Sequence, residues 1–147
     1  MNRFPFYLTG TLVETIQGNE RLFGAEDVFF STTDLKGVIR HANQTFLTLA
    51  RHPREEMIGA PHNIIRHDDM PAGVFKFMWD DIQAGRPVCA YVLNRAGDGL
   101  DYWVFAMVTA IEDGYVSVRT KPLDEGAFAA VREVYGRVRA LEREAIE

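Results

Sequence analysis

The chain has 147 residues, of which 47% are hydrophobic and 25% are charged, a composition that excludes a disordered or low-complexity chain and fits one globular domain. The formal net charge of −5 argues against a nucleic-acid-binding surface, which needs a surplus of basic residues. The single cysteine excludes an internal disulfide framework, and no apolar run approaches the roughly 18 residues that span a membrane, so we expect a cytoplasmic protein without direct membrane insertion.

The N-terminal third predicts a cap segment followed by a hairpin. Residues 1–25 are weakly patterned, although 11–17 favour a short helix that ends at Gly18. Residues 28–33 are β-branched and aromatic, which is typical of a strand. The turn-forming residues at 34–37 then allow 38–41 to pair back onto that strand.

Several helices are predicted after the hairpin. Asn43 is suited to cap a helix over 44–50, and Pro53 is suited to begin a second helix over 54–58. Residues 60–70 have no regular pattern. A stronger helix begins at Pro71 and ends at Gly85. Its apolar stripe has helical spacing and consists of Val74, Phe75, Met78, Trp79 and Ile82.

Three strands and a helix complete the chain. The strands are expected over 88–94, 101–111 and 115–120, and an amphipathic helix over 124–144. Because strands and helices are segregated along the chain, we predict an α+β fold with an antiparallel sheet. Both faces of 101–111 are apolar, so one face must meet the short helices and the other the terminal segments or a second chain.

Three groups of residues resemble PAS domains. The first is the run from Ser31 to Asn43, which contains Asp34-Leu35-Lys36-Gly37. The second is Pro61–Pro71 together with Phe75–Trp79. The third is Asn94-Arg95 with Gly97 and Asp101-Tyr102-Trp103-Val104. Together they resemble the PAS sensors of bacterial aerotaxis receptors over about residues 29–122.

That resemblance implies a PAS fold, with a five-stranded antiparallel sheet, short helices on one face and terminal helical segments. It divides the chain into a cap segment (1–25), a PAS domain (26–122) and a signalling or dimerisation helix (123–147). In that family the domain binds FAD non-covalently and reports redox state to a signalling partner. The flavin contacts that it implies, position by position, are Asn43, Arg66, His67, Asp69, Phe75, Trp79 and Asn94.

The chain departs from the family pattern in the strand nearest the implied cofactor. Val88 stands where the family often has Trp, Cys89-Ala90 where a Ser-Gly pair is typical, and Leu93 where Lys is common. These differences favour an alternative, a cofactor-free interaction or dimerisation module whose pocket is filled by its own side chains.

The implied contacts also have purely structural interpretations. Asn94 shares a strand face with small apolar residues and is suited to read a ring edge, or to bond nearby backbone as a core amide. Arg66 is suited to pair with a phosphate, or with Asp68 or Asp69, which are themselves suited to cap the next helix. Phe75 and Trp79 fit either the core or a stack against a flavin.

Other chemistries remain to be weighed. His62 and His67 permit a haem-binding gas sensor, because a neutral imidazole is a good axial ligand. Cys89 lies on a strand, facing away from Asn94, so we expect a small buried apolar group and no flavin adduct. The sequence has neither a nucleophile-elbow pattern nor the histidine spacing of a zinc protease, so we expect no enzyme and no metal site.

We therefore predict a cytoplasmic redox sensor that binds FAD between the sheet and the short helices. On reduction of the flavin, Asn94 and the segment 66–69 would rearrange their hydrogen bonds, and the sheet would pass that change to a signalling partner. A homodimer is expected, and the identity of the partner is left open.

Overall fold

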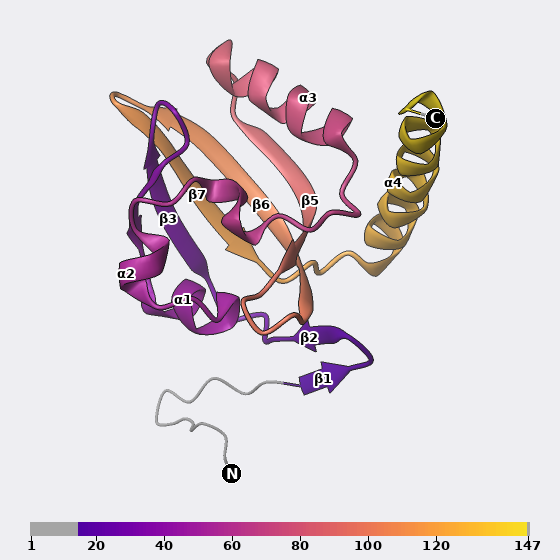
Figure 1. Ribbon diagram of the computed structural model, residues 1–147, viewed down its shortest axis with the longest axis horizontal. Helices are drawn as coiled ribbons and strands as arrows, with labels where there is room; N and C mark the ends of the chain where they lie inside the picture. Colours follow the sequence, from indigo (N-terminus) through magenta and orange to yellow (C-terminus); the bar gives the residue numbers. More distant parts are fainter. Residues whose placement is uncertain (1–14, 147) are drawn as a thin grey trace.

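The computed structural model describes residues 15–146, with side chains described within 18–145 (Figure 1). The strands are β1 (Thr15–Gln17), β2 (Glu20–Leu22), β3 (Phe29–Asp34), β4 (Ile39–Ala42), β5 (Val88–Arg95), β6 (Asp101–Ile111) and β7 (Gly114–Thr120). The helical segments are α1 (Gln44–Ala50), α2 (Arg54–Met57), the 3₁₀ helix η1 (His62–Ile65), α3 (Ala72–Gln83) and α4 (Glu125–Ile146). The predicted α+β class is confirmed.

The predicted antiparallel sheet is present as five strands in the order β5–β6–β7–β3–β4, with every neighbouring pair antiparallel. The sheet is larger than predicted, because β1 and β2 form an added hairpin. A single parallel pairing, Glu20 with Asp101, joins this hairpin to β6. The whole sheet is therefore mixed and seven-stranded across the described residues.

The predicted short helix over 11–17 is wrong for its last residues, since Thr15–Gln17 form strand β1. Residues 11–14 lie outside the described residues. Gly18 has a φ of +63° and turns the chain back into β2, so the residue read as a helix end begins a hairpin turn instead. The amide of Asp101 donates to the carbonyl of Asn19, which fixes the turn against β6.

The short helices cover one face of the sheet, as Figure 1 shows for α1, α2 and α3. Tightly packed rings fill one end of this inner layer: Phe29 lies between Phe46 of α1 and Tyr102 of β6, with centroids 6.3 and 6.1 Å away. All three are fully buried. At the other end α3 crosses the sheet, where it meets a smaller apolar cluster of Ile82, Val88 and Tyr115.

Helix α4 packs on the opposite face of β5 and β6. Phe128 and Tyr135 contact Trp103, and the Tyr135 hydroxyl donates to the carbonyl of Tyr91 over 2.8 Å. This helix meets the expectation that a terminal segment covers the outer apolar face of β6. Its cover is partial, because Cys89, predicted as buried, is exposed on β5. The strand pleat turns Cys89 outward, and α4 does not close over it.

The far end of α4 reaches the beginning of α3. The Glu142 carboxylate accepts hydrogen bonds from the backbone amides of Ala72 and Gly73, at 3.0 and 2.9 Å. Arg143 pairs with Asp69 just upstream, over 3.1 Å. A carboxylate at a helix N-terminus satisfies free amides and complements the helix dipole. Pro71 occupies the N-cap position of α3 and makes no capping hydrogen bond with its side chain. Glu142 at the end of α4 therefore caps this helix instead.

None of the helices in residues 15–146 combines the length and the apolar character needed to cross a membrane.

Close packing of the β6–β7 turn against β3 leads to a stability prediction. A Cβ at Gly114 would overlap the backbone carbonyl oxygen of Thr33. We expect Gly114→Ala to lower the free energy of unfolding by about 1–3 kcal/mol, because the paired backbone must shift. Gly136 in α4 has open space around its Cβ position, so Gly136→Ala should raise it by about 0.5–1 kcal/mol. Urea denaturation of both variants and the wild type measures these changes. A Gly114→Ala variant as stable as Gly136→Ala would contradict the prediction.

Candidate functional site

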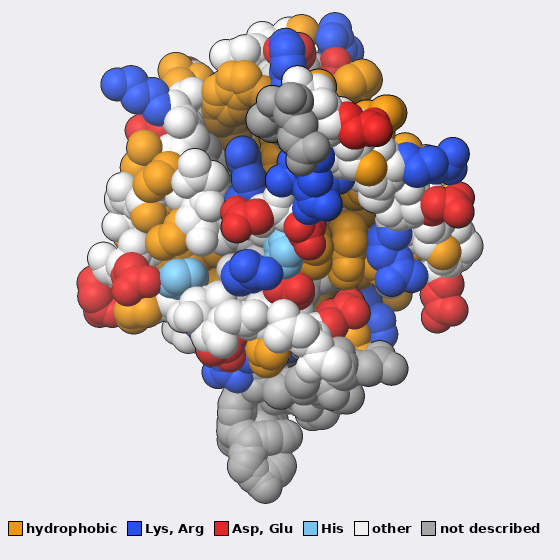
Figure 2. Space-filling model, turned by 45° about the vertical axis from the view of Figure 1, so that its right-hand side comes forward, with side chains coloured by type: hydrophobic (Ala, Val, Ile, Leu, Met, Phe, Trp, Pro, Cys, Tyr) orange, Lys and Arg blue, Asp and Glu red, His pale blue; other side chains and the backbone are white. Residues whose placement is uncertain are grey.

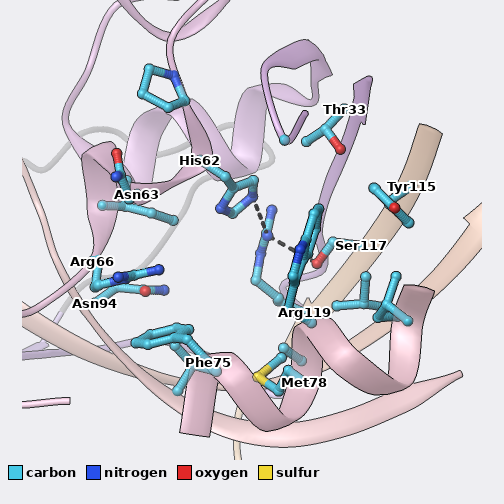
Figure 3. A pocket seen from close by; sticks show the side chains of 18 of the residues that line it. Thr33, His62, Asn63, Arg66, Phe75, Met78, Asn94, Tyr115, Ser117 and Arg119 are labelled. Atoms are coloured by element: carbon cyan, nitrogen blue, oxygen red, sulfur yellow. Dashed lines mark hydrogen bonds between the residues drawn. The ribbon is translucent and has the colours of Figure 1, made fainter. Parts of the chain in front are cut away.

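A cavity of about 360 Å³ lies between the sheet and the helical layer (Figure 3). The inner face of the sheet forms its floor, η1 and Arg66 form one wall, and α3 forms the other. Its volume falls within the range of small-molecule sites. The lining residues that carry chemistry are Thr33, Lys36, His62, Asn63, Arg66, Phe75, Trp79, Asn94, Tyr115, Ser117 and Arg119.

Small side chains on the floor leave this space open. Val92 of β5, Ala106 and Val108 of β6 and Ser117 of β7 all face inward. Because alternate residues of a strand share a face, these positions form one shallow surface beneath α3. The prediction that small residues beside an inward-facing Asn94 leave room for a flat ligand therefore matches the geometry at Val92 and Asn94.

The wall contributed by α3 is aromatic. Phe75 and Trp79 are four residues apart, so one helix face presents both of them to the cavity. The guanidinium carbon of Arg66 lies 3.8 Å from the centre of the Phe75 ring, and Trp79 meets Tyr115 edge-on. Arg66 is exposed as a residue, but partial burial of its guanidinium lowers its pKa, and it remains a cation.

Asn94 occupies the deep end of β5 and is only 3% exposed. Its backbone bridges to Arg66, which brings the two side chains together, as Figure 3 shows. The buried Nδ2 of Asn94 makes no hydrogen bond of standard geometry, although the Asn94 side chain interacts with the Tyr102 hydroxyl on the paired position of β6. A buried amide donor at the edge of a cavity is suited to an acceptor supplied by a ligand.

Arg119 projects from β7 into the cavity and is 2% exposed. It donates hydrogen bonds to His62 Nε2 at 2.9 Å, Ser117 Oγ at 3.0 Å and Ser31 Oγ at 2.9 Å. Its guanidinium carbon also lies 4.2 Å from the centre of the Phe46 ring. Burial lowers the pKa of Arg119 to about 10, so it carries a positive charge at neutral pH.

The charges that line the cavity all have one sign. Lys36, Arg66 and Arg119 are cations, and no Asp or Glu is among the lining residues. The outer surface differs, because acidic and basic side chains lie interspersed on the face shown in Figure 2. A chain with net charge −5 thus encloses a cavity with a positive lining, which favours an anionic ligand.

Four of the seven predicted contacts meet at this cavity, namely Arg66, Phe75, Trp79 and Asn94. Asn43 lies elsewhere, because its side chain clamps α1 to β3. Its Oδ1 accepts from the amides of Phe46 and Phe30, and its Nδ2 donates to the carbonyl of Val28. The alternative interpretation of Asn43 as a helix cap describes this geometry.

His67 and Asp69 are not among the residues that line the cavity. His67 is 4% exposed, accepts from the Asp69 amide at Nδ1, and lies 3.1 Å from the Asp101 carboxylate and 2.7 Å from Arg95 at Nε2. These contacts hold the His67 ring between its own segment and the strands β5 and β6. His67 thereby fastens to β6 the segment that carries Arg66, and Asp69 joins the same segment to α4 through Arg143.

Sequence reasoning missed the contribution of β7. The cavity is lined by three residues of this strand, Tyr115, Ser117 and Arg119. The sequence pattern predicts only a strand over 115–120 and assigns none of them to a site. The period of two places these residues on one face, and an arginine on the buried face of a strand is an unusual pattern. That pattern was the available signal.

Comparison with known proteins places this geometry in context. A family model described as PAS fold matches residues 18–120. The aerotaxis receptor of Escherichia coli (strain K12) is 39% identical over 115 residues, which cover 75% of this chain. The chain spans about a fifth of the length of that receptor, 22%.

Solved structures share the fold at lower identity. The dark structure of the blue-light photoreceptor Aureochrome1 LOV has a TM-score of 0.64 and 23% identity, over 74% of this chain and 85% of its own. A Rhodobacter sphaeroides LOV protein has a TM-score of 0.60 and 14% identity, over 68% of this chain and 62% of its own.

The buried imidazole of His62 predicts a pH-dependent stability. Burial, and next the charge of Arg119, lowers the pKa of His62 from 6.5 to about 3. Between these values the unfolded chain protonates His62 and the folded protein does not, so stability falls as the pH drops below about 6.5. The slope from one site is at most about 1.4 kcal/mol per pH unit.

His62→Gln keeps an acceptor near Arg119 and removes the titration. We expect the stability advantage of the wild type over His62→Gln to shrink by about 2 kcal/mol between pH 7 and pH 5. Urea denaturation at both pH values measures it. A difference that does not change with pH would show that His62 titrates alike in the folded and unfolded states.

Proposed function

This chain belongs to the PAS-fold family, and from that premise we propose that it is a redox sensor of the aerotaxis-receptor type that binds FAD. The observation that carries the proposal is the cavity itself, with its aromatic wall, its buried Asn94 amide that makes no hydrogen bond of standard geometry through Nδ2, and its lining of cations without acids. The 39% identity to an aerotaxis receptor supports the same conclusion.

The residues of the cavity fit a flavin on three counts. The Asn94 Nδ2 is suited to donate to an acceptor on a ring edge. Phe75 and Trp79 supply an apolar wall for a flat aromatic group. Arg66 and Lys36 are exposed cations beside the same cavity and are suited to the phosphates of a dinucleotide.

A bound flavin would supply reversible electron uptake, which changes the charge and hydrogen bonding of its ring. The chain would read that change through Asn94 and Arg66, whose backbones are bridged. From Arg66 the segment continues through His67, held on Asp101, to Asp69, held on Arg143 of α4. We place the output at α4, where displacement of this segment would alter the contacts available to a partner or a second copy.

Two alternatives make different use of the same residues. A haem sensor would need a free imidazole, but Nε2 of His62 already accepts from Arg119, and His67 does not line the cavity. A cofactor-free module would need its pocket filled, but about 360 Å³ is open. Both observations favour the flavin.

The decisive experiment is a visible spectrum of protein purified without added cofactor, followed by titration with FAD and with riboflavin. We expect saturable binding of FAD that is tighter than that of riboflavin, because the cations beside the cavity contact the phosphates. A Soret band would favour haem instead. A colourless protein that does not bind added FAD would leave the cofactor-free module.

Replacing the buried amide tests the site directly. Asn94→Ala removes the Nδ2 donor, and we expect FAD affinity to fall at least about tenfold, the equivalent of one good hydrogen bond to a ligand. Gln83→Ala, an exposed amide at the end of α3, is the matched control and should retain affinity. Fluorescence quenching of FAD gives both constants, and equal affinities would rule Asn94 out as a contact.

The proposed output route predicts a local effect of Glu142. In Glu142→Ala the amides of Ala72 and Gly73 lose their acceptors, so the first turn of α3 should exchange hydrogen for deuterium faster. Addition of FAD should then protect α4 less than in the wild type. Glu144→Ala, an exposed change on the same helix, should leave both signals as they are. Unchanged exchange in Glu142→Ala would exclude this route.

A further inference from the structure

A buried charge without a countercharge is the feature of the cavity that the flavin contacts do not explain. Arg119 is 2% exposed, and the groups that accept from it are two serine hydroxyls and a histidine. Each of these groups is neutral, since the low pKa of His62 keeps its ring unprotonated. No ion pair with a carboxylate is found for Arg119 among the described residues. Its Nε is also buried without a partner.

Such an arrangement is costly unless a ligand completes it. A buried ion normally requires a countercharge and filled hydrogen-bonding positions. Arg119 has hydrogen bonds that fix its guanidinium in place, but nothing in the described part of the chain neutralises it. The neighbouring cavity also lacks acids, so a compensating negative charge would have to come from the ligand.

The position of Arg119 separates it from the other two cations. Arg66 and Lys36 are exposed, whereas Arg119 is buried on the sheet beside Ser117. Exposed cations are screened by water and salt, and a buried cation is screened far less. Arg119 therefore acts most strongly on the part of a ligand that enters the cavity furthest.

We propose that the positive charge of Arg119 stabilises a negatively charged flavin ring in the inner cavity. Arg119 would in this way raise the reduction potential of the bound flavin. The inference rests on the proposed function, since it assumes that a flavin occupies this cavity. Reduction adds two electrons from a reductant, such as dithionite, and one proton from solvent to a neutral oxidised ring. The ring then carries one negative charge, which Arg119 stabilises relative to the oxidised form.

The effect of the Arg119 charge on the flavin can be removed in two ways, by deleting the cation or by pairing it with an added carboxylate. Arg119→Gln deletes the cation and keeps donor groups, and Arg119→Lys restores the charge without the planar fork. Ser117→Asp keeps Arg119 but places a carboxylate where Ser117 Oγ now lies, 3.0 Å from the guanidinium, and so supplies the missing partner. Ser117→Asn is its uncharged match. Arg137→Gln removes an exposed charge on α4 and controls for net charge.

The measurement is the midpoint potential of FAD-loaded protein, by titration with dithionite against a reference dye. We expect Arg119→Gln and Ser117→Asp each to lower the potential by at least about 30 mV, which corresponds to a tenfold change in the ratio of the affinities for reduced and oxidised flavin. Arg119→Lys, Ser117→Asn and Arg137→Gln should stay near the wild type.

The outcomes separate this inference from the proposed function. If the wild type binds no FAD, the proposed function fails and this inference fails with it. If the wild type binds FAD but Arg119→Gln and Ser117→Asp both keep the wild-type potential, only the role of Arg119 is overturned. Should Arg119→Gln not fold, Ser117→Asp against Ser117→Asn decides the question, because the added carboxylate pairs with a charge that the fold already holds. Equal potentials in that pair would contradict the proposal.

Discussion

The small side chains on the inner face of β5, β6 and β7 are the constraint on which the site depends. At one end of this face large rings fill the space beneath α1, with Phe29 and Tyr102 in contact. At the other end Val108 pairs with Ser117 and Ala106 with Arg119, so small side chains line the cavity beneath α3. Because a sheet and a helix keep their separation along a rigid interface, the missing volume remains as a cavity instead of being closed by collapse.

Polar groups in that layer follow from the pairing of β3 with β7. Ser31 lies directly opposite Ser117, so a pair of hydroxyls faces the helical layer in register. The two hydroxyls are the acceptors that hold Arg119, and His62 of η1 closes the same network from above. The pairing of β3 with β7 thus provides the polar groups that orient a charge beside the opening in the core.

The sequence patterns predicted local structure well and long-range contacts poorly. The helix over 44–50 and the strand over 101–111 have the predicted bounds, because helical and strand periods are local properties. Asp69 was predicted as a flavin contact, but it pairs with Arg143, which is 74 positions away in the sequence. A contact over that separation leaves no local pattern from which it could be predicted. Likewise the interpretation of 115–120 as a plain strand overlooked Arg119, since its meaning depends on η1 and β3. The roles of the seven predicted contacts stay predictions, although the cavity brings four of them together.

The exposed thiol of Cys89 is a natural labelling site for spectroscopy. It is the single cysteine of the chain and lies on the outer surface of β5, in a groove that α4 borders with Val131, Val134 and Val138. The cavity is on the opposite side of the same strand, at Val92 and Asn94. One thiol-reactive spin label or fluorophore would therefore sit beside the proposed output helix while the ligand side stays chemically untouched, so that movements of α4 become visible without any engineered residue.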